Sequence, residues 1–363
     1  MRRYVKALFG GTLLSIWCAS TLAQAPTSQG DASAITVPIL YSTDLFHPYD
    51  DPDDHFDLAT LFATKEFDIR GIVLDLGDRQ KHKTGRPAVE QMMHITGRRV
   101  PIAIGLGTPL RSRTDDARDQ PEEFQAAVNL ILETLRKSGE KVTIFTTGSC
   151  RDVAAAFNRE PGLMKRKVKA VYTNVGNGPQ GKQDEHNVKP DPQAYARLIE
   201  SGLPLYWCPC FGADGYQTHY RADQAEVVAA CRPAARNFFA YALSRSKADP
   251  IAFLASEPPR PPAGERSMWC TAPLLHAAGR SIYERGKDDF AALPRPEGHK
   301  AGKEVVVFEF VPMTASVDKD AKVLKTELRP AQPTGFVFRV ADGRRYNPVL
   351  NSCLKNLLAG LGR

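Results

Sequence analysis

Short apolar runs rich in β-branched residues alternate along this chain with longer segments in which apolar residues recur at helical spacing. The short runs predict strands at 37–43, 70–75, 100–104, 141–146, 168–173 and 203–207. The longer segments predict helices at 54–64, 86–96, 121–138, 150–158, 191–201 and 222–246. Near-continuous apolar strands separated by helices are typical of a parallel sheet that is covered on both faces. The pattern therefore predicts an α/β fold with a mostly parallel, Rossmann-like open sheet.

The C-terminal part of the chain continues this pattern, but a proline-rich segment interrupts it. Residues 257–266 contain too many prolines for a helix interior and predict an extended connector. A helix is expected at about 272–285, strands at 304–311 and 335–340, and a closing helix at 347–360. The strands extend the sheet or form an antiparallel hairpin. Nothing in this part requires a second domain, so one domain is predicted over 36–361.

The N-terminus has the pattern of a secretory signal. A basic head that contains Arg2 and Arg3 is followed by a short apolar run and then by small residues up to Ala25. This arrangement predicts a signal peptide over 1–25, and the Ser, Gly and Pro content of 26–35 predicts a flexible leader. The apolar run is too short for a confident membrane anchor. We therefore expect a secreted or periplasmic protein with no membrane segment after signal removal.

Composition and cysteine content exclude some classes of function. The net charge of +7 and the pI near 9.0 come from scattered basic residues, which predict a solvated surface and no nucleic-acid partner. Without Cys18, six cysteines remain in the exported chain, and an even number permits disulfides. Cys208 and Cys210 have no second pair at zinc spacing, so buried thiols or one disulfide are expected.

The most informative segment is an acidic loop directly after the first predicted strand. Six aspartates fall within fourteen residues: Asp44, Asp50, Asp51, Asp53, Asp54 and Asp57. Crowded carboxylates repel one another unless a cation or a proton joins them. Ligands of parallel sheets bind outside the carboxyl ends of the strands, where this loop lies. The alternative without a bound ligand is a solvated acidic turn that caps the following helix.

Several segments, in order, resemble the inosine-uridine preferring nucleoside hydrolase family over roughly residues 37–207. The first half of the family's aspartate loop matches Ser42-Thr43-Asp44, and the second half matches 53–59, with a few extra residues between them. Further matches fall at 71–78, 100–110, 142–148 and 185–194. The resemblance implies the family's fold and hydrolysis of the N-glycosidic bond of a ribonucleoside.

The resemblance also implies a bound Ca²⁺ and a general base. It places the ion on Asp44, Asp54 and the backbone carbonyl of Thr147. Hard oxygen ligands of this kind suit Ca²⁺, and Mg²⁺ shares the preference. Asp44 would also take the proton of the attacking water, whose pKa the ion lowers.

Substrate contacts follow from the same resemblance. Asp53 would accept a hydrogen bond from a ribose hydroxyl, and Asp78 would do so in place of the family's usual amide. Glu185 and Asn187 would hold the 5′ side of the sugar. Trp269 is a candidate for stacking on the base or aglycone, with core packing as its alternative role.

The chain also departs from the family. Thr271 and Ala272 stand where the family has a late His-Asp pair that contacts the leaving group and the ion. Asp214, or Asp50 and Asp51, are candidates to replace that ligand. Two alternatives therefore stay open: a nucleoside- or sugar-binding protein that has lost turnover, and a hydrolase of another glycoside. A homo-oligomer is compatible with the sequence, which does not determine the oligomeric state.

Overall fold

The first predicted strand is an interior strand of a large sheet. The computed structural model describes residues 36–179, 185–257, 260, 263–318 and 323–362. β1 (Val37–Thr43) is buried along its whole length and pairs in parallel with β2 (Phe67–Leu74) and with β4 (Val142–Thr146). Full burial on both faces explains why this strand is a continuous apolar run.

The sheet has nine strands in the order β13-β12-β14-β6-β5-β4-β1-β2-β3. Its other members are β3 (Ile102–Ile104), β5 (Val168–Thr173), β6 (Leu205–Trp207), β12 (Phe308–Val317), β13 (Val323–Leu328) and β14 (Gly335–Val340). The strands from β3 to β14 are parallel, whereas β12 is antiparallel to both of its neighbours. The predicted α/β fold with a mostly parallel sheet is therefore confirmed.

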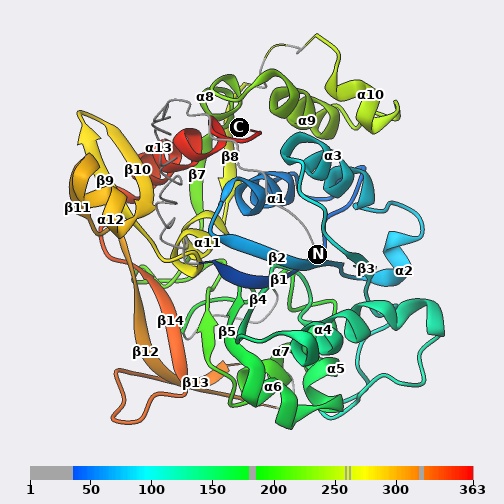
Figure 1. Ribbon diagram of the computed structural model, residues 1–363. Helices are drawn as coiled ribbons and strands as arrows, with labels where there is room; N and C mark the ends of the chain where they lie inside the picture. The colour runs from blue at the N-terminus through cyan, green and yellow to red at the C-terminus, as the bar shows by residue number, and fades with distance from the viewer. Residues whose placement is uncertain (1–35, 180–184, 258–259, 261–262, 319–322, 363) are drawn as a thin grey trace, which may run out of the picture. The chain divides into compact units, whose positions relative to one another are not determined.

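Helices cover both faces of this sheet, as Figure 1 shows. One face packs on α1 (Asp53–Ala63), α3 (Arg86–Thr96), α9 (Pro233–Leu243) and α13 (Tyr346–Leu358). The other face packs on α4 (Ala126–Lys137), α5 (Arg151–Arg159), α6 (Pro161–Lys167) and α7 (Pro192–Ile199). Along β1, the side chains of Ile39 and Tyr41 enter the first core and that of Leu40 enters the second. This alternation is the period of two expected for a strand.

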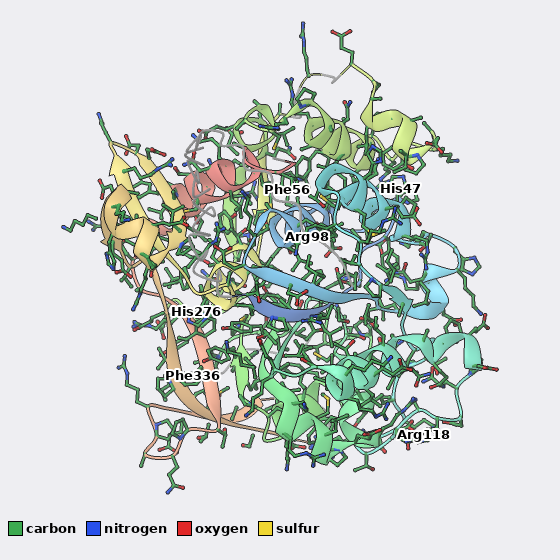
Figure 2. All side chains as sticks on the ribbon, in the orientation of Figure 1. His47, Phe56, Arg98, Arg118, His276 and Phe336 are labelled. Atoms are coloured by element: carbon green, nitrogen blue, oxygen red, sulfur yellow. The ribbon has the colours of Figure 1, made fainter. Side chains whose placement is uncertain are left out.

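A row of aromatic rings crosses five neighbouring strands on one face of the sheet. Each ring lies opposite the next in the strand register, and the ring centroids are 4.6–5.9 Å apart. The row consists of Tyr41, Phe145, Tyr172, Tyr206 and Phe336, the last of which is labelled in Figure 2. His276, also labelled there, lies beside it and accepts or donates a 2.8 Å hydrogen bond between Nδ1 and the Tyr172 hydroxyl.

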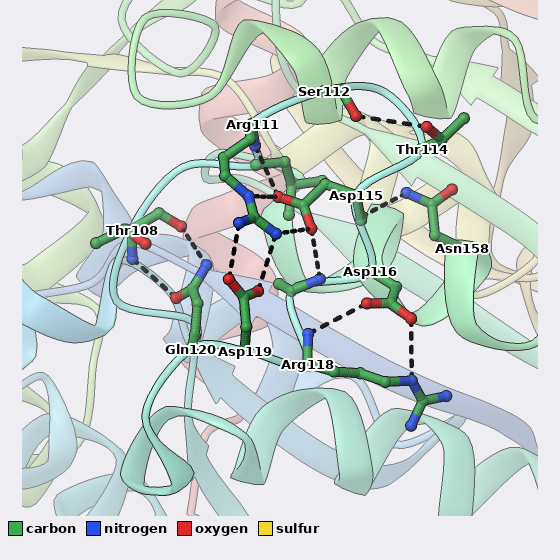
Figure 3. Close-up of polar contacts among 12 residues, drawn as sticks. Thr108, Arg111, Ser112, Thr114, Asp115, Asp116, Arg118, Asp119, Gln120 and Asn158 are labelled. Atoms are coloured by element: carbon green, nitrogen blue, oxygen red, sulfur yellow. Dashed lines mark hydrogen bonds and ion pairs between the residues drawn. The ribbon is translucent and has the colours of Figure 1, made fainter.

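The loop between β3 and the short 3-10 helix η1 (Glu122–Phe124) is held by side chains (Figure 3). The Arg111 guanidinium binds Asp115 at 3.0 Å and Asp119 at 2.8 Å, and this contact lowers the pKa of Asp115 to about 2. The Asn158 amide, from α5, donates to the carbonyls of Arg113 and Asp115. These contacts fix the loop without regular secondary structure.

Four predicted segments were wrong in their detail. The helix predicted over 222–246 is instead β7 (Tyr220–Asp223), α8 (Gln224–Ala229) and α9. Pro233 begins α9, because proline has no N–H to continue the preceding helix. The end of the predicted connector overlaps the first two residues of β8 (Glu265–Met268), which pairs with β7.

The helix predicted over 272–285 ends early. α11 (Thr271–Ala277) stops before Gly279, whose φ of 72° lies in the left-handed region that favours glycine. β9 (Arg280–Gly286) then pairs with β10 (Asp289–Pro294) and β11 (Lys303–Val305) in a separate antiparallel sheet. The strand predicted over 304–311 is therefore divided between β11 and β12. The remaining short helices are α2 (Gly77–Gln80), α10 (Pro250–Leu254) and α12 (Arg295–Ala301).

The signal peptide and leader predicted over 1–35 lie outside the described residues. Thr36–Arg363 form one compact unit. Among the residues that the structure describes, no helix combines the length and apolar character needed to cross a bilayer. The six cysteines within the described ranges are buried and unpaired.

Candidate active site

The acidic loop lines a cavity of about 250 Å³ at the carboxyl ends of β1, β4 and β5. The described lining consists of Asp44, Asp50, Asp51, Asp53, Asp54, Asp57, Thr147, Asn174, Glu185, His186, Asn187, Cys210, Phe211, Trp269 and Cys270. Strand ends of a parallel sheet are the expected ligand position. The sequence-predicted residues Asp44, Asp53, Asp54, Thr147, Glu185, Asn187 and Trp269 thus lie on one cavity.

Backbone contacts hold the loops after β1 and β4 against each other. The Thr147 amide donates to the carbonyl of Ser42 at 2.9 Å. A Cβ on Gly148 would lie 2.5 Å from Asp75 Oδ2 and 3.1 Å from the backbone nitrogen of Asp44. Only glycine permits so close an approach without a shift of these groups. The positions of Asp44 and of the Thr147 carbonyl are therefore fixed by the sheet and by this glycine.

The aspartates are electrostatically coupled. Burial raises the pKa of Asp44 to about 8, with further contributions from the charges of Asp75 and Glu185. Burial also raises the pKa of Asp53 and of Asp54 well above the usual value, and each is raised further by other aspartates of the loop. A cation between these carboxyl groups would relieve their mutual repulsion.

Asp57 contributes a buried carboxyl group to the cavity lining. It is 1% exposed, and neither of its oxygens has a hydrogen-bond partner that meets normal geometry in the described residues. Burial raises the pKa of Asp57 to about 7, and the neighbouring Cys270 thiol acts in the opposite direction. A buried acid without strong partners costs stability in its ionised form, which is a feature of functional sites.

Glu185 and Asn187 are held in place by the loops that follow the strands. Glu185 Oε2 accepts a hydrogen bond from the Gly176 amide at 2.8 Å, and its Oε1 accepts from the Asn187 amide at 3.1 Å. The Asn187 side-chain amide donates to the carbonyl of Thr147 at 2.7 Å. Asn187 therefore connects the sugar-binding side predicted from sequence to the carbonyl predicted as a metal ligand.

Asn174 belongs to the site but was not predicted as a site residue. Its side-chain nitrogen donates to the carbonyl of Cys208 at 2.9 Å and to Thr218 Oγ1 at 3.1 Å. Its buried Oδ1 has no partner among the described residues, although Asn174 lines the cavity. Its position directly after a predicted strand was the signal that could have identified it, since Asp44 and Thr147 occupy equivalent positions.

Aromatic side chains form part of the cavity lining. Phe211 and Trp269 meet edge to face with centroids 5.7 Å apart, and His219 lies 5.3 Å from Trp269. Phe211 is 45% exposed, which is unusual for a large apolar side chain in this protein. The Trp269 indole Nε1 has no described partner. Trp269 is thus half-buried at the cavity with one free donor, and it also packs against the core.

The structure does not bring Asp78 to this cavity. Leu76 adopts a left-handed φ of 59°, α2 begins at Gly77, and the Asp78 side chain is 62% exposed with Lys81 Nζ at 3.8 Å. Asp75 points inward instead and accepts hydrogen bonds from the Ser149 amide and hydroxyl at 2.6 and 2.9 Å. Asp78 is therefore absent from the described lining, and the buried carboxyl group near Asp44 belongs to Asp75.

No carboxylate stands at positions 271 and 272, where the family resemblance implies a His-Asp pair. Thr271 is buried and its hydroxyl is 2.8 Å from the Tyr220 hydroxyl, while Ala272 is fully buried. Asp214 is exposed and is absent from the described lining, whereas Asp50 and Asp51 are part of it.

Within the described ranges, no three His, Cys, Asp or Glu side chains have the arrangement of a metal site. Asp44 and Asp54 are close enough for the charge of one to raise the pKa of the other, and both line the cavity together with Thr147 and with Asn174, whose Oδ1 has no partner among the described residues. This hard donor set, including non-carboxylate oxygens, fits Ca²⁺ or Mg²⁺.

Comparison with known proteins identifies the family that this chain resembles. Residues 41–260 match the family model described as inosine-uridine preferring nucleoside hydrolase. The pyrimidine-specific ribonucleoside hydrolase RihA of Escherichia coli O1:K1 is 28% identical over 189 residues, which are 47% of this chain and 59% of that protein. The match thus spans less than two thirds of that relative's length.

Two solved structures share the fold. A plant nucleoside hydrolase, PpNRh1, superposes with a TM-score of 0.53 and 16% identity over 89% of this chain and 99% of its own. An inosine-guanosine nucleoside hydrolase superposes with a TM-score of 0.55 and 13% identity over the same shares. At this identity the two structures establish similarity of fold alone.

Proposed function

Because the chain belongs to the inosine-uridine preferring nucleoside hydrolase family, we propose that it hydrolyses the N-glycosidic bond of a ribonucleoside or a related N-glycoside. The observation that carries the proposal is the convergence of Asp44, Asp54 and the Thr147 loop on one cavity with Glu185 and Asn187. These residues come from three separate segments, which follow β1, β4 and β5. Their convergence supports a site that binds a sugar beside a cation and a base.

Asp44 is the proposed general base. Its carboxyl group is 8% exposed and stands at the end of β1, held next to the Gly148 turn. Without a cation, burial and the charge of Asp75 raise the pKa of Asp44 to about 8. A bound cation would favour the ionised carboxylate, which is the form that can accept a proton. In the proposed step Asp44 takes a proton from water as the water oxygen bonds to C1′ of the sugar, while the C1′–N bond breaks, its electron pair stays on the departing base, and the base takes up a proton from solvent.

Ca²⁺ is the proposed cofactor, held by Asp44, Asp54 and the Thr147 carbonyl, with Asn174 Oδ1 as a further oxygen donor. When bound, such an ion lowers the pKa of a water molecule and attracts sugar hydroxyls. The donor set fits this role because it consists of hard oxygens whose mutual repulsion a positive ion offsets.

The remaining residues would position the sugar. Asp53 is 7% exposed on the first turn of α1 and is proposed to accept a hydrogen bond from a ribose hydroxyl. Glu185 and Asn187 are proposed to hold the opposite end of the sugar. As the C1′–N bond breaks, the sugar develops positive charge, and nearby carboxylates stabilise it.

The test is release of free ribose from a panel of nucleosides by the purified mature protein, with Ca²⁺ and with chelator. Asp44→Asn should lower kcat at least about a thousandfold, because it removes the base and a ligand together. Asp68→Asn is the matched control, since Asp68 is half-exposed on β2 and paired with Arg70 at 2.5 Å. Equal activity in Asp44→Asn and wild type would refute the assignment.

A binding protein without turnover is the second candidate. It is favoured by Thr271 and Ala272, which supply neither a leaving-group donor nor a carboxylate ligand at the late position. Saturable nucleoside binding in calorimetry without any product would select it. Release of sugar from nitrophenyl glycosides, but from no nucleoside, would instead select a hydrolase of another glycoside.

Export is proposed from the N-terminal sequence, with a secreted or periplasmic location. Mass spectrometry of the protein recovered from the periplasm and from the medium would test it. A mature chain that begins close to residue 24 or 26 is expected, and an intact Met1 in both fractions would contradict cleavage.

A further inference from the structure

Basic residues gather at the edge of the sheet opposite the cavity. Neighbouring strands from β1 to β6 are parallel, so the segments that lead into them lie at one edge, and the cavity lies at the other. The segments that lead into β2 to β6 are 64–66, 97–101, 137–141, 165–169 and 200–204. They contain nine basic and three acidic residues. The basic residues are scattered along the sequence, and the topology brings them together.

Six of these nine basic side chains are available to a partner. They are exposed, and none has an ion-pair partner within the described residues: Lys65, Arg99, Lys141, Lys165, Arg166 and Lys169. The other three, Arg98, Lys137 and Lys167, already bind carbonyl or carboxylate oxygens.

The acids of these segments do not cancel this charge. Glu66 lies 2.8 Å from the Arg280 guanidinium, and Glu200 lies 2.7 Å from that of Arg113. Two of the three acids, Glu66 and Glu200, therefore have basic partners of their own, and Glu140 is the third. An excess of positive charge remains at this edge.

Helix dipoles account for only part of the pattern. α1, α3, α4 and α6 end at the same edge, and basic residues near a helix C-terminus offset its partial negative charge. That charge is about half an elementary charge per helix, so about two basic residues would offset all four helices. Lys65, Lys141 and Lys169 moreover lie outside the helices. The excess therefore points to a partner outside the chain.

The charges are close enough to act together. They lie at the amino ends of the adjacent strands β3-β2-β1-β4-β5. Neighbouring strands are about 4.8 Å apart, so these ends span about 19 Å. Because the Debye length is about 8 Å at physiological ionic strength, each charge lies within the field of its neighbours. A broad anionic surface would contact several of them at once.

We propose that this edge docks on a bilayer surface that carries anionic phospholipid headgroups. Clusters of about four to eight lysines and arginines bind such surfaces through charge, without a membrane-spanning segment. The five segments contain no aromatic residue on which the bases of a single-stranded nucleic acid would stack. β1 also begins at this edge, so the segment before Thr36, which the proposed export carries through a membrane, joins the chain there. The cavity faces away from the bilayer in this orientation.

The test is sedimentation of the purified mature protein with vesicles. One set contains phosphatidylcholine alone, and the other contains equal parts of phosphatidylcholine and phosphatidylglycerol. A chelator is present, so that Ca²⁺ does not bridge acidic side chains to lipid. The partition coefficient should be at least about tenfold higher for the anionic vesicles. It should fall at least about tenfold between about 0.05 M and about 0.5 M salt, because screening weakens the attraction.

Two variants with the same loss of charge locate the surface. The edge variant carries Lys141→Gln, Lys165→Gln, Arg166→Gln and Lys169→Gln. The control variant carries the same change at four exposed basic residues of loops beside the carboxyl ends of the strands: Lys81, Arg86, Lys189 and Lys247. The edge variant should lower the partition coefficient at least about tenfold, and the control variant less than about twofold. Both should keep the wild-type urea midpoint, since substitutions at exposed positions change stability little.

The outcomes separate this inference from the proposed function, on which it does not depend. Equal binding to both kinds of vesicle, or an equal loss of binding in the two variants, would overturn the inference. Tighter binding to a DNA duplex than to the anionic vesicles, in the same buffer, would overturn it in favour of a nucleic acid. Absence of ribose release from every nucleoside would overturn the proposed function and leave the docking surface standing.

Discussion

Asp152, on the first turn of α5, provides a stability prediction that is independent of catalysis. Its side chain is 1% exposed, and its Oδ1 accepts a hydrogen bond from the Leu106 amide at 2.9 Å. Its Oδ2 has no partner among the described residues. Burial and the charge of Asp75 raise the pKa of Asp152 and the Leu106 hydrogen bond and Arg151 lower it, with a net value of about 7. Asp152→Asn keeps the acceptor for Leu106 and removes the titration.

The magnitude follows from linkage between folding and protonation. Because the folded pKa is higher than the unfolded one, Asp152 favours folding most below about pH 4, and this contribution is lost as pH rises to about 7. Each pKa unit corresponds to about 1.4 kcal/mol, so the complete loss is about 4 kcal/mol. Between pH 5 and pH 8 the wild type should therefore lose about 3 kcal/mol through this residue alone.

The assay is urea unfolding at pH 5 and pH 8, with chelator present at both. The other buried aspartates titrate in both proteins, so the difference between wild type and Asp152→Asn isolates this group. The free energy of unfolding of the variant should fall by about 3 kcal/mol less than that of wild type across this interval. Asp68→Asn, at a half-exposed position, is the control. Parallel pH profiles for wild type and Asp152→Asn would refute the reasoning.

Two further substitutions test how the site is supported. Arg151→Met removes the partner of the buried Asp191 carboxylate, which lies 3.1 Å away, and should lower the free energy of unfolding by about 3–5 kcal/mol, whereas Arg118→Met at an exposed ion pair should change it little (Figures 2 and 3). A wild-type urea midpoint in Arg151→Met would contradict this. Gly148→Ala should lower kcat/KM at least about tenfold, because the added Cβ displaces Asp75 or Asp44, whereas Gly139→Ala has open space and should retain activity. Full activity in Gly148→Ala would show that this turn does not set the site geometry.

The sequence was most informative for elements with clear boundaries along the chain. β1, β5, β14 and α3 begin and end at the predicted residues, because apolar runs or helical periodicity are bounded there by polar residues or glycine. The small sheet β9–β11 was not predicted, since its strands form only through pairing between segments up to about 20 residues apart and local periodicity resembles a helix.

The sequence predicted two of the site residues that lie directly after a strand. Asp44 and Thr147 come directly after neighbouring strands, so parallel topology alone brings them together. Asp78 fails for a local reason, because the left-handed Leu76 and the start of α2 turn its side chain to solvent. Phe211 could not be identified, since its approach to Trp269 joins segments 58 residues apart that share no motif.

The residues of the aromatic row are absent from the described cavity lining, but they constrain the positions of the residues that form it. Asp44, Thr147 and Asn174 follow β1, β4 and β5, whose mutual alignment the stacked rings of Tyr41, Phe145 and Tyr172 help to define. If one of these strands slipped by a single residue, its terminal group would move by about 3.3 Å and its side chains would exchange faces. The positions of the site residues therefore depend on hydrophobic packing in the middle of the sheet. A change in that packing would lower activity before it unfolded the protein.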